Sequence, residues 1–269
     1  MRNRLTDELA VCGLNAVKAL GEYHPERINR LFLREEQLRV FSQTCKKLAE
    51  WKRPYKICED EELERLCKSS RHQGVVAMMF QPEVEGADEE DLDTWAAGKT
   101  GLILHNIGND HNLGAIIRSA AFFDVSYAVI SESERESLLT TSAYRVAEGG
   151  MEHVCFRRVQ STAAFLKAAS KRIITIGTDI RARQRIGDLP LILTEEAKKT
   201  KYGGKAGAKQ AQGPRPGIAL VLGNEETGLP EEIRSLCSIL VRIPGTGLVE
   251  SLNVAQAAAL FMHSLYEFS

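Results

Sequence analysis

The residues with the clearest chemical potential lie in the last fifty positions, in two glycine-bearing turns. The first turn reads LGNEETGLP over residues 222–230, and the second reads IPGTGLVESLNV over residues 243–254. Glycine lets backbone amides and carbonyls approach a ligand closely, so such turns can hydrogen-bond a purine, a ribose or an amino acid. The pattern therefore predicts a nucleoside cofactor.

Each turn follows an apolar segment typical of a strand, Gly217–Leu222 or Ile239–Ile243, and leads into a helical pattern. Such loops lie at the carboxyl ends of parallel strands, where α/β proteins bind ligands. Residues 245–247 match part of a dinucleotide fingerprint, but Glu250 replaces its third glycine and too little sequence follows for the further strand. A nicotinamide oxidoreductase is therefore the weakest hypothesis.

A further polar turn follows the predicted strand Gly101–Leu104 and opens a helix that carries Asn112 and Arg118. We expect Asn112 to cap this helix. Arg118 lies nearly two turns further on, where an ordinary solvated side chain is the alternative to a functional one. Ser251 has no G-x-S-x-G motif around it, so capping of the last helix is the alternative to a catalytic role.

Several kinds of chemistry lose support from spacing and composition. The six histidines and six cysteines show no metal-binding or C-x-x-C spacing, so we expect no metal and reduced thiols. The chain has 269 residues, 43% of them hydrophobic, and no apolar run long enough for a membrane span. Its amino-terminal residues lack the apolar core of a signal peptide, so we expect a cytoplasmic protein.

Charge divides the chain into two mildly basic blocks around an acidic one. Residues 81–98 hold seven acidic and no basic side chains, which predicts a solvated linker between domains at 1–80 and 99–269. The first domain reads as a small α/β unit, with helices expected at 9–20 and 36–51. The second reads as a doubly wound parallel sheet with a basic loop insertion at 195–216, which could contact RNA or simply be disordered.

Three blocks in this order resemble the signature motifs of the SpoU/TrmH family. They are Asn112-x5-Arg118, the LGNE-x-x-G block at 222–228 and the IP-x-x-G-x-VESLNV block at 243–254. This family consists of SPOUT-class RNA ribose 2′-O-methyltransferases. Residues 147–153 and the turn at 245–247 look most similar to its YfiF-like branch. Residues 5–80 are similar to the substrate-binding domain often fused in front, a fold shared with a ribosomal protein that binds kink-turn RNA.

The resemblance implies a C-terminal α/β domain with a deep trefoil knot, S-adenosyl-L-methionine as cofactor, a homodimer, and tRNA or rRNA as substrate. By position, the implied catalytic residues are Arg118, Asn112, Glu225, Ser251 and Asn253. The implied cofactor-binding residues are Thr178, Leu222, Gly223, Asn224, Ile243, Gly247, Ser251 and Leu252, chiefly through their backbone atoms.

The third motif departs from the family pattern, because Gly245 replaces a methionine and Ala255-Gln256 replaces Ser-Val. Two hypotheses therefore remain. The first is an active RNA 2′-O-methyltransferase, which the retained arginine, glutamate, serine and asparagine favour. The second is an RNA-binding knot protein that has lost methyltransferase activity.

Overall fold

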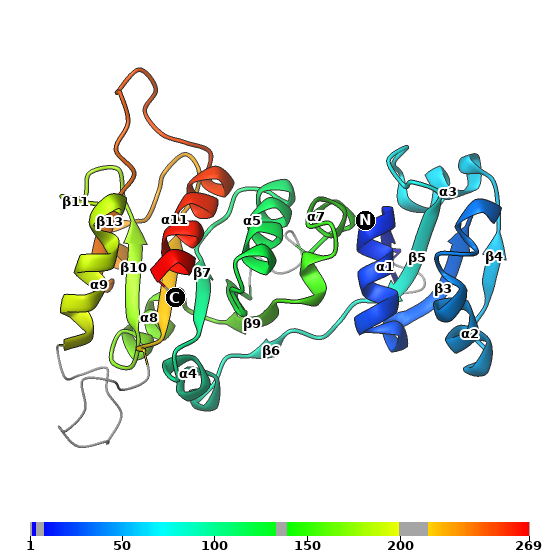
Figure 1. Cartoon of the computed structure of the whole chain (residues 1–269), viewed down its shortest axis with the longest axis horizontal. Coiled ribbons are helices and arrows are strands. Elements are labelled where there is room, and N and C mark those ends of the chain that lie inside the picture. Colours follow the sequence, from blue (N-terminus) through cyan, green and yellow to red (C-terminus); the bar gives the residue numbers. More distant parts are fainter. Residues whose placement is uncertain (1, 4–7, 133–138, 199–214, 269) are drawn as a thin grey trace. The chain divides into compact units, whose positions relative to one another are not determined.

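The computed structural model of the chain describes residues 2–3, 8–132, 139–198 and 215–268 (Figure 1). Most of the predicted basic insertion, residues 199–214, lies outside this described part. The chain forms two compact units. The first comprises Met1–Glu83, Asn109–Arg118 and Glu136–His153, and the second comprises Val84–Gly108, Ser119–Arg135 and Val154–Ser269.

A five-stranded sheet with strand order β1-β2-β5-β3-β4 forms the core of the first unit. Its strand pairs are antiparallel, except for the parallel pair β3 and β4. In Figure 1 the elements of this sheet are coloured from blue to cyan. Its elements are β1 (Arg2–Asn3), β2 (Glu8–Cys12), α1 (Leu14–Tyr23), β3 (Ile28–Leu33), α2 (Ser42–Glu50), β4 (Tyr55–Ile57), α3 (Asp60–Cys67) and β5 (Val75–Phe80).

The expected helix over residues 9–20 is wrong in its first part. Residues Glu8–Cys12 form β2 instead, and the helix begins only at Leu14. All five residues of β2 are buried because helices such as α1 and α3 pack against this strand, whereas a surface helix buries only one stripe. The expected helix over 36–51 also begins later, at Ser42, after a short 3-10 turn at Glu35–Gln37.

The first unit also contains the start of α5 (Asp110–Phe122), together with α7 (Thr141–Val146) and a 3-10 turn at Gly150–Glu152. A hydrogen bond from Thr140 to the Asp110 carboxylate joins α5 to the start of α7. The side chain of Glu152 is 1% exposed and lies 3.3 Å from Nη1 of Arg27. Burial raises the pKa of Glu152 to about 7, although Arg27 favours the ionised form.

The second unit is built on an eight-stranded sheet in which every neighbouring pair is parallel, with strand order β11-β13-β10-β12-β7-β8-β9-β6. The expected parallel α/β sheet is therefore confirmed. The strands are β6 (Glu85–Gly86), β7 (Thr100–Leu104), β8 (Tyr127–Ser131), β9 (Cys155–Val159), β10 (Ile174–Thr178), β11 (Gln184–Arg185), β12 (Ile218–Leu222) and β13 (Ile239–Arg242). The helices are α4 (Glu89–Ala96), α8 (Thr162–Ala169), α9 (Leu189–Lys198), α10 (Glu231–Arg234) and α11 (Val254–Phe268).

Residues 84–98 of the acidic segment, which was expected at 81–98 to be a solvated linker, belong to the second unit. They contain β6 and α4, and a capping box between Asp88 and Asp91 begins the helix. Leu92 and Trp95 are 4% and 1% exposed and belong to the core beneath the sheet. The acidic composition did not predict this packing, because two large apolar side chains at helical spacing are enough to bury one face of a short helix.

Glu152 provides a test of the packing in the first unit. Its pKa is raised from 4.5 to about 7, so its ionisation destabilises the folded state. The protonated carboxyl of Glu152 stabilises the folded state. Its contribution is fully present below pH 4.5 and is lost as the pH rises to about 7. We expect Glu152→Gln to remove that loss and to raise the free energy of unfolding at pH 8 by on the order of 1–3 kcal/mol.

Denaturant unfolding at several pH values measures this effect. The matched control is Glu148→Gln, because Glu148 lies in the same segment and accepts a hydrogen bond from Asn15 at 2.8 Å without being fully buried. Parallel pH profiles for the wild type and Glu152→Gln would contradict the assignment.

Candidate active site

The candidate site lies where β12 is inserted between β10 and β7. Because β12 pairs in parallel with both neighbours, the three strands end at the same edge of the sheet. Strand β13 pairs in parallel with β10 and ends beside them. The loops after β7, β10, β12 and β13 therefore share one edge of the second unit, as expected of a ligand site in a doubly wound sheet.

The loop after β12 is tied to the loop after β7 by two hydrogen bonds. The side chain of Asn224 donates to the backbone carbonyl of Asn106 at 2.9 Å. The backbone amide of Gly108 donates to the carboxylate of Glu225 at 2.8 Å. A Cβ atom on Gly108 would lie 2.5 Å from that carboxylate oxygen, so glycine is needed for this approach. Asn224 and Glu225 thus fix the backbone that leads into α5.

The turn after β12 is organised by Asn224. Its side-chain oxygen accepts hydrogen bonds from the backbone amides of Glu226 and Thr227 at 3.0 and 3.1 Å, which is the geometry of an Asx turn. Gly223 is buried directly against this turn, and a Cβ atom there would lie 2.5 Å from the backbone carbon of Gly228. The LGNE-x-x-G pattern therefore has a steric and hydrogen-bonding basis.

Thr178 ends β10 beside the same turn. Its hydroxyl donates to the backbone carbonyl of Val221 at 3.3 Å, and it is partly buried. Leu222 is fully buried at the end of β12, so only its backbone is placed to meet a ligand. The expected cofactor residues Thr178, Leu222, Gly223 and Asn224 are thus brought together in the second unit.

The third motif forms an exposed loop between β13 and α11. Ile243 is partly buried, whereas every residue from 244 to 253 is exposed, including Gly247, Ser251 and Leu252. Leu248 and Val249 are 90% and 72% exposed, which is unusual for such apolar side chains. The loop presents backbone groups and apolar side chains together.

The cap expected at Asn112 is wrong, and so is the capping role considered as the alternative for Ser251. Asn109, not Asn112, caps α5, because its side-chain oxygen accepts the backbone amide of Asn112 at 2.8 Å. Asn253, not Ser251, caps α11, because its side-chain oxygen accepts the backbone amide of Ala255 at 2.8 Å. Each chain segment offers two cap-forming residues, and the first helical residue decides which of them serves.

Asn112 and Arg118 both lie on the part of α5 that belongs to the first unit. Arg118 is exposed, and within the described residues no ion pair involves it. Asn112 is partly buried and has interactions of its own.

His105 was missed by the sequence reasoning, although it directly follows β7 at the switch point. Burial lowers its pKa, with a smaller opposing effect from Glu232, so the imidazole is neutral at physiological pH. Its Nδ1 is buried and has no hydrogen-bond partner in the described part of the chain. The available signal was its position directly after a central strand, at the edge of the sheet where doubly wound folds bind ligands.

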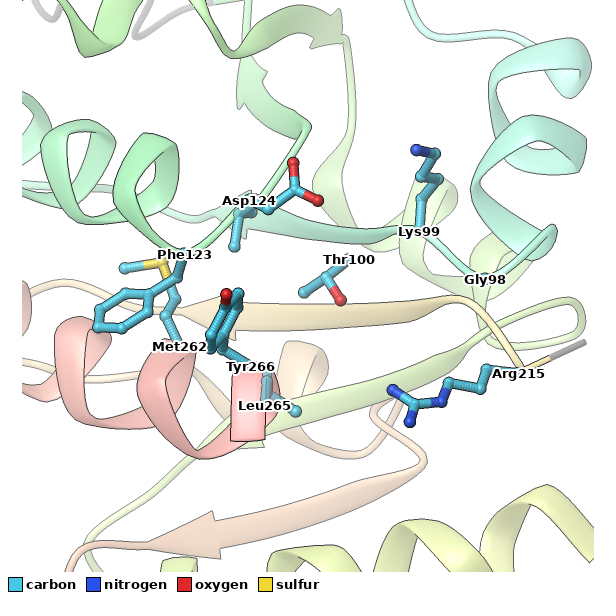
Figure 2. Close-up of a pocket in the computed structure, with 10 residues that line it drawn as sticks. Gly98, Lys99, Thr100, Phe123, Asp124, Arg215, Met262, Leu265 and Tyr266 are labelled. Carbon is cyan, nitrogen blue, oxygen red and sulfur yellow. The ribbon is translucent and has the colours of Figure 1, made fainter. Parts of the chain in front are cut away.

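A hollow of about 280 Å³ lies elsewhere in the second unit (Figure 2). Thr100 begins β7 and Val125 precedes β8, so this hollow opens at the amino ends of the strands. Arg215, which precedes β12, and Tyr266 of α11 complete its wall. It is therefore separate from the loops at the carboxyl ends of the strands.

No set of three or more His, Cys, Asp or Glu side chains in the described part of the chain is arranged to hold a metal ion. No helix in that part combines the length and apolar character needed to cross a membrane.

Comparison with known proteins gives two family matches. Residues 99–263 match the model of the SpoU rRNA Methylase family, and residues 10–85 match a model described as RNA 2′-O ribose methyltransferase substrate binding. The chain belongs to the SpoU rRNA methylase family. The resemblance inferred from the three motifs is confirmed, as is the expected class of enzyme, an RNA ribose 2′-O-methyltransferase.

Relatives align with almost the whole SpoU-family chain. The 23S rRNA (guanosine-2′-O-)-methyltransferase RlmB of Acinetobacter baylyi is 32% identical over 95% of this chain and 94% of its own. The RlmB of Bordetella pertussis is 28% identical over 94% of each. An uncharacterized tRNA/rRNA methyltransferase, YfiF of Escherichia coli O157:H7, is 27% identical over 97% of this chain and 69% of its own. Closer kinship with the YfiF-like branch stays a prediction.

Solved structures share the fold. The SpoU methyltransferase AviRb of Streptomyces viridochromogenes, in complex with AdoMet, matches with a TM-score of 0.69 at 20% identity over 99% of this chain and 93% of its own. An AdoMet-bound rRNA methyltransferase from Sinorhizobium meliloti matches with a TM-score of 0.68 at 20% identity over 97% and 87%. The mixed α/β fold with a parallel sheet is confirmed.

Gly223 provides a test of the second motif. Its replacement by alanine places a Cβ atom 2.5 Å from the Gly228 backbone carbon, so the turn has to shift. We expect Gly223→Ala to lower the free energy of unfolding by about 1–3 kcal/mol and to weaken cofactor binding.

Gly187→Ala is the matched control, because a Cβ atom on Gly187 meets nothing within 4 Å and the residue lies outside the motif loops. Thermal unfolding followed by calorimetric titration measures both effects. Equal stability of the two variants would show that the turn after β12 is not closely packed.

Proposed function

We propose that this SpoU-family chain transfers a methyl group from S-adenosyl-L-methionine to the 2′-hydroxyl of a guanosine in 23S rRNA. The convergence of the second and third motif loops at the carboxyl ends of β12, β10 and β13 carries the proposal. The choice of 23S rRNA and guanosine is supported by the activity named for the RlmB relatives. The cofactor is supported by the two AdoMet-bound structures of the same fold.

The loops have the chemistry that S-adenosylmethionine requires. We assign cofactor binding to Thr178, Leu222, Gly223, Asn224, Ile243, Gly247, Ser251 and Leu252. The exposed backbone of residues 244–253 offers amides and carbonyls for the adenine edge and the ribose, and its apolar side chains can cover the adenine ring. The cofactor supplies an activated methyl group when bound.

We assign catalysis to Arg118, Asn112, Glu225, Ser251 and Asn253. Methyl transfer forms the bond between the ribose oxygen and the methyl carbon, breaks the bond between that carbon and sulfur, and releases the proton of the hydroxyl. A guanidinium stays protonated in proteins, so Arg118 is unsuited to be the base. Arg118 instead holds the neighbouring phosphate and stabilises the charge developing on oxygen, while the proton passes to phosphate or water.

The remaining assigned residues act mainly by positioning. Glu225 holds the amide of Gly108 and Asn253 caps α11, so each fixes a backbone segment beside the proposed cofactor. Ser251 is exposed beside Leu252 and offers its hydroxyl to the ribose or the substrate. Asn112 precedes Arg118 on α5 and is assigned to the RNA.

We further propose a homodimer with a trefoil knot at the carboxyl-terminal end. Its support is the exposure of large apolar side chains, with Phe122 at 79% and Leu248 at 90% in the single chain. The proposed domains are an RNA substrate-binding domain at 1–80, an acidic connection at 81–98 and a methyltransferase domain at 99–269. With RNA as the substrate, we place the protein in the cytoplasm.

Calorimetric titration with S-adenosylmethionine and S-adenosylhomocysteine tests the cofactor assignment without knowledge of the RNA. We expect micromolar dissociation constants and one site per chain. Absence of binding to the folded dimer would favour the alternative, an RNA-binding knot protein without methyltransferase activity, with the turn at Gly245 as its cause.

Arg118→Lys tests the proposed catalytic role. A lysine keeps the charge but loses the planar, two-pronged contact with phosphate, so we expect the single-turnover rate to fall on the order of a hundred-fold. Binding of S-adenosylhomocysteine should stay unchanged.

The matched control for this variant is Arg172→Lys, at an arginine that precedes the amino end of β10 and pairs with Asp93 at 2.7 Å, away from the proposed site. It should methylate at the wild-type rate. A near-normal rate for Arg118→Lys would exclude the role assigned to Arg118.

A further inference from the structure

An arginine-rich segment continues from the candidate site to the edge of the second sheet. Strand β10 ends at Thr178, and the chain then turns through Asp179–Ala182 into the edge strand β11. Arg181, Arg183 and Arg185 are all exposed along this segment. Three cations at alternate positions thus lie beyond the carboxyl end of a strand that borders the proposed cofactor.

The acidic side chain that begins this segment is already neutralised. The carboxylate of Asp179 is 5% exposed and pairs with Arg234 at 2.5 Å and, more loosely, with Arg181 at 3.7 Å. Arg183 and Arg185 have no ion-pair partner among the residues that the structure describes. Their charges are therefore available to a ligand.

A second arginine lies beside Arg185 on the neighbouring strand. Arg185 and Arg242 are direct partners in the parallel pair of β11 and β13, so their side chains start from the same face of the sheet. Like charges placed opposite one another destabilise a sheet. Moreover, Nε of Arg242 is buried without a hydrogen-bond acceptor in the described part of the chain. An anion between the two guanidinium groups would relieve both defects.

Toward the opposite edge of the same sheet, arginines are paired with carboxylates. There, on β9, Arg157 pairs with Asp91 at 2.9 Å and Arg158 with Glu132 at 2.6 Å, and Arg172, which precedes β10, pairs with Asp93 at 2.7 Å. Two of these carboxylates come from the acidic helix α4. Surplus positive charge therefore remains at the β11 edge.

We propose that Arg183, Arg185 and Arg242 bind backbone phosphates of the RNA substrate. A guanidinium offers two parallel donors that match a phosphate, and it is weakly hydrated, so it suits a partly buried anion site. Arg242 is followed directly by Ile243 of the third motif, so a bound phosphate lies close to the proposed methyl donor. This inference rests on the proposed function and adds a surface that holds the RNA beside it.

The test is the double variant Arg183→Ala/Arg185→Ala, because both side chains are exposed and their removal spares the core. Fluorescence anisotropy measures binding to an unmodified 23S rRNA transcript over a range of salt concentrations. We expect affinity to fall on the order of ten-fold at physiological salt, and the slope of log affinity against log salt to shrink by about 0.7–0.9 for each phosphate that is no longer bound. Arg183→Lys/Arg185→Lys should retain most of the slope, because the charges remain.

The matched control is Lys167→Ala/Lys171→Ala. It removes the same charge from two exposed lysines. These precede β10, so they lie at the opposite end of that strand from Arg183. We expect wild-type RNA affinity and slope for this variant. Equal losses in both double variants would mean that only net charge matters, which would overturn the inference.

Two further readouts separate the possible failures. Binding of S-adenosylhomocysteine and the dimer mass should be unchanged in Arg183→Ala/Arg185→Ala, whereas a lost dimer would assign these arginines to a subunit contact and overturn the inference. If the wild type methylates the transcript but the variant binds it equally well, the inference fails alone. If the wild type neither binds cofactor nor methylates RNA, the proposed function fails instead.

Discussion

The hydrogen bond from the Gly108 amide to the Glu225 carboxylate is the contact on which the candidate site depends most directly. It joins the loops after β7 and β12, which are neighbouring parallel strands of the sheet. A charged acceptor makes this bond stronger than an ordinary backbone contact. It also fixes the backbone of Gly108 in the loop after β7 through a carboxylate more than a hundred positions later in the sequence.

This arrangement gives the motif residues a physical hierarchy. Asn224, Glu225 and Asn253 make contacts that shape the backbone, whereas residues 244–252 leave their backbone and side chains exposed. The rigid turns can therefore be preorganised before any ligand arrives, as a catalytic site requires. The proposed cofactor then meets a loop whose two ends are anchored, by β13 on one side and by the capped α11 on the other.

The sequence predicted the central strands well, because β7, β10, β12 and β13 are apolar runs bounded by polar turns, a pattern typical of a parallel sheet buried on both faces. It did not predict β2, whose residues 8–12 run into α1 and share its apolar character. The sequence did not predict the strand order either, since periodicity says nothing about which strands become neighbours. The contact between Gly108 and Glu225 depends on that order, so the positions of the motifs were predictable whereas their mutual contacts were not.

The sequence did not predict the helix caps or the local distribution of charge, because both depend on residues that are neighbours in space. Whether Asn109 or Asn112 caps α5 depends on where the chain leaves the sheet, and the same holds for Ser251 and Asn253. A net charge of −1 suggests little affinity for RNA. Yet Asp91 and Asp93 of α4 pair with Arg157 and Arg172, whereas Arg183 and Arg185 at the β11 edge have no ion-pair partner among the described residues. An anion approaching the protein responds to that local field, because charges farther away than about 8–10 Å are screened at physiological salt.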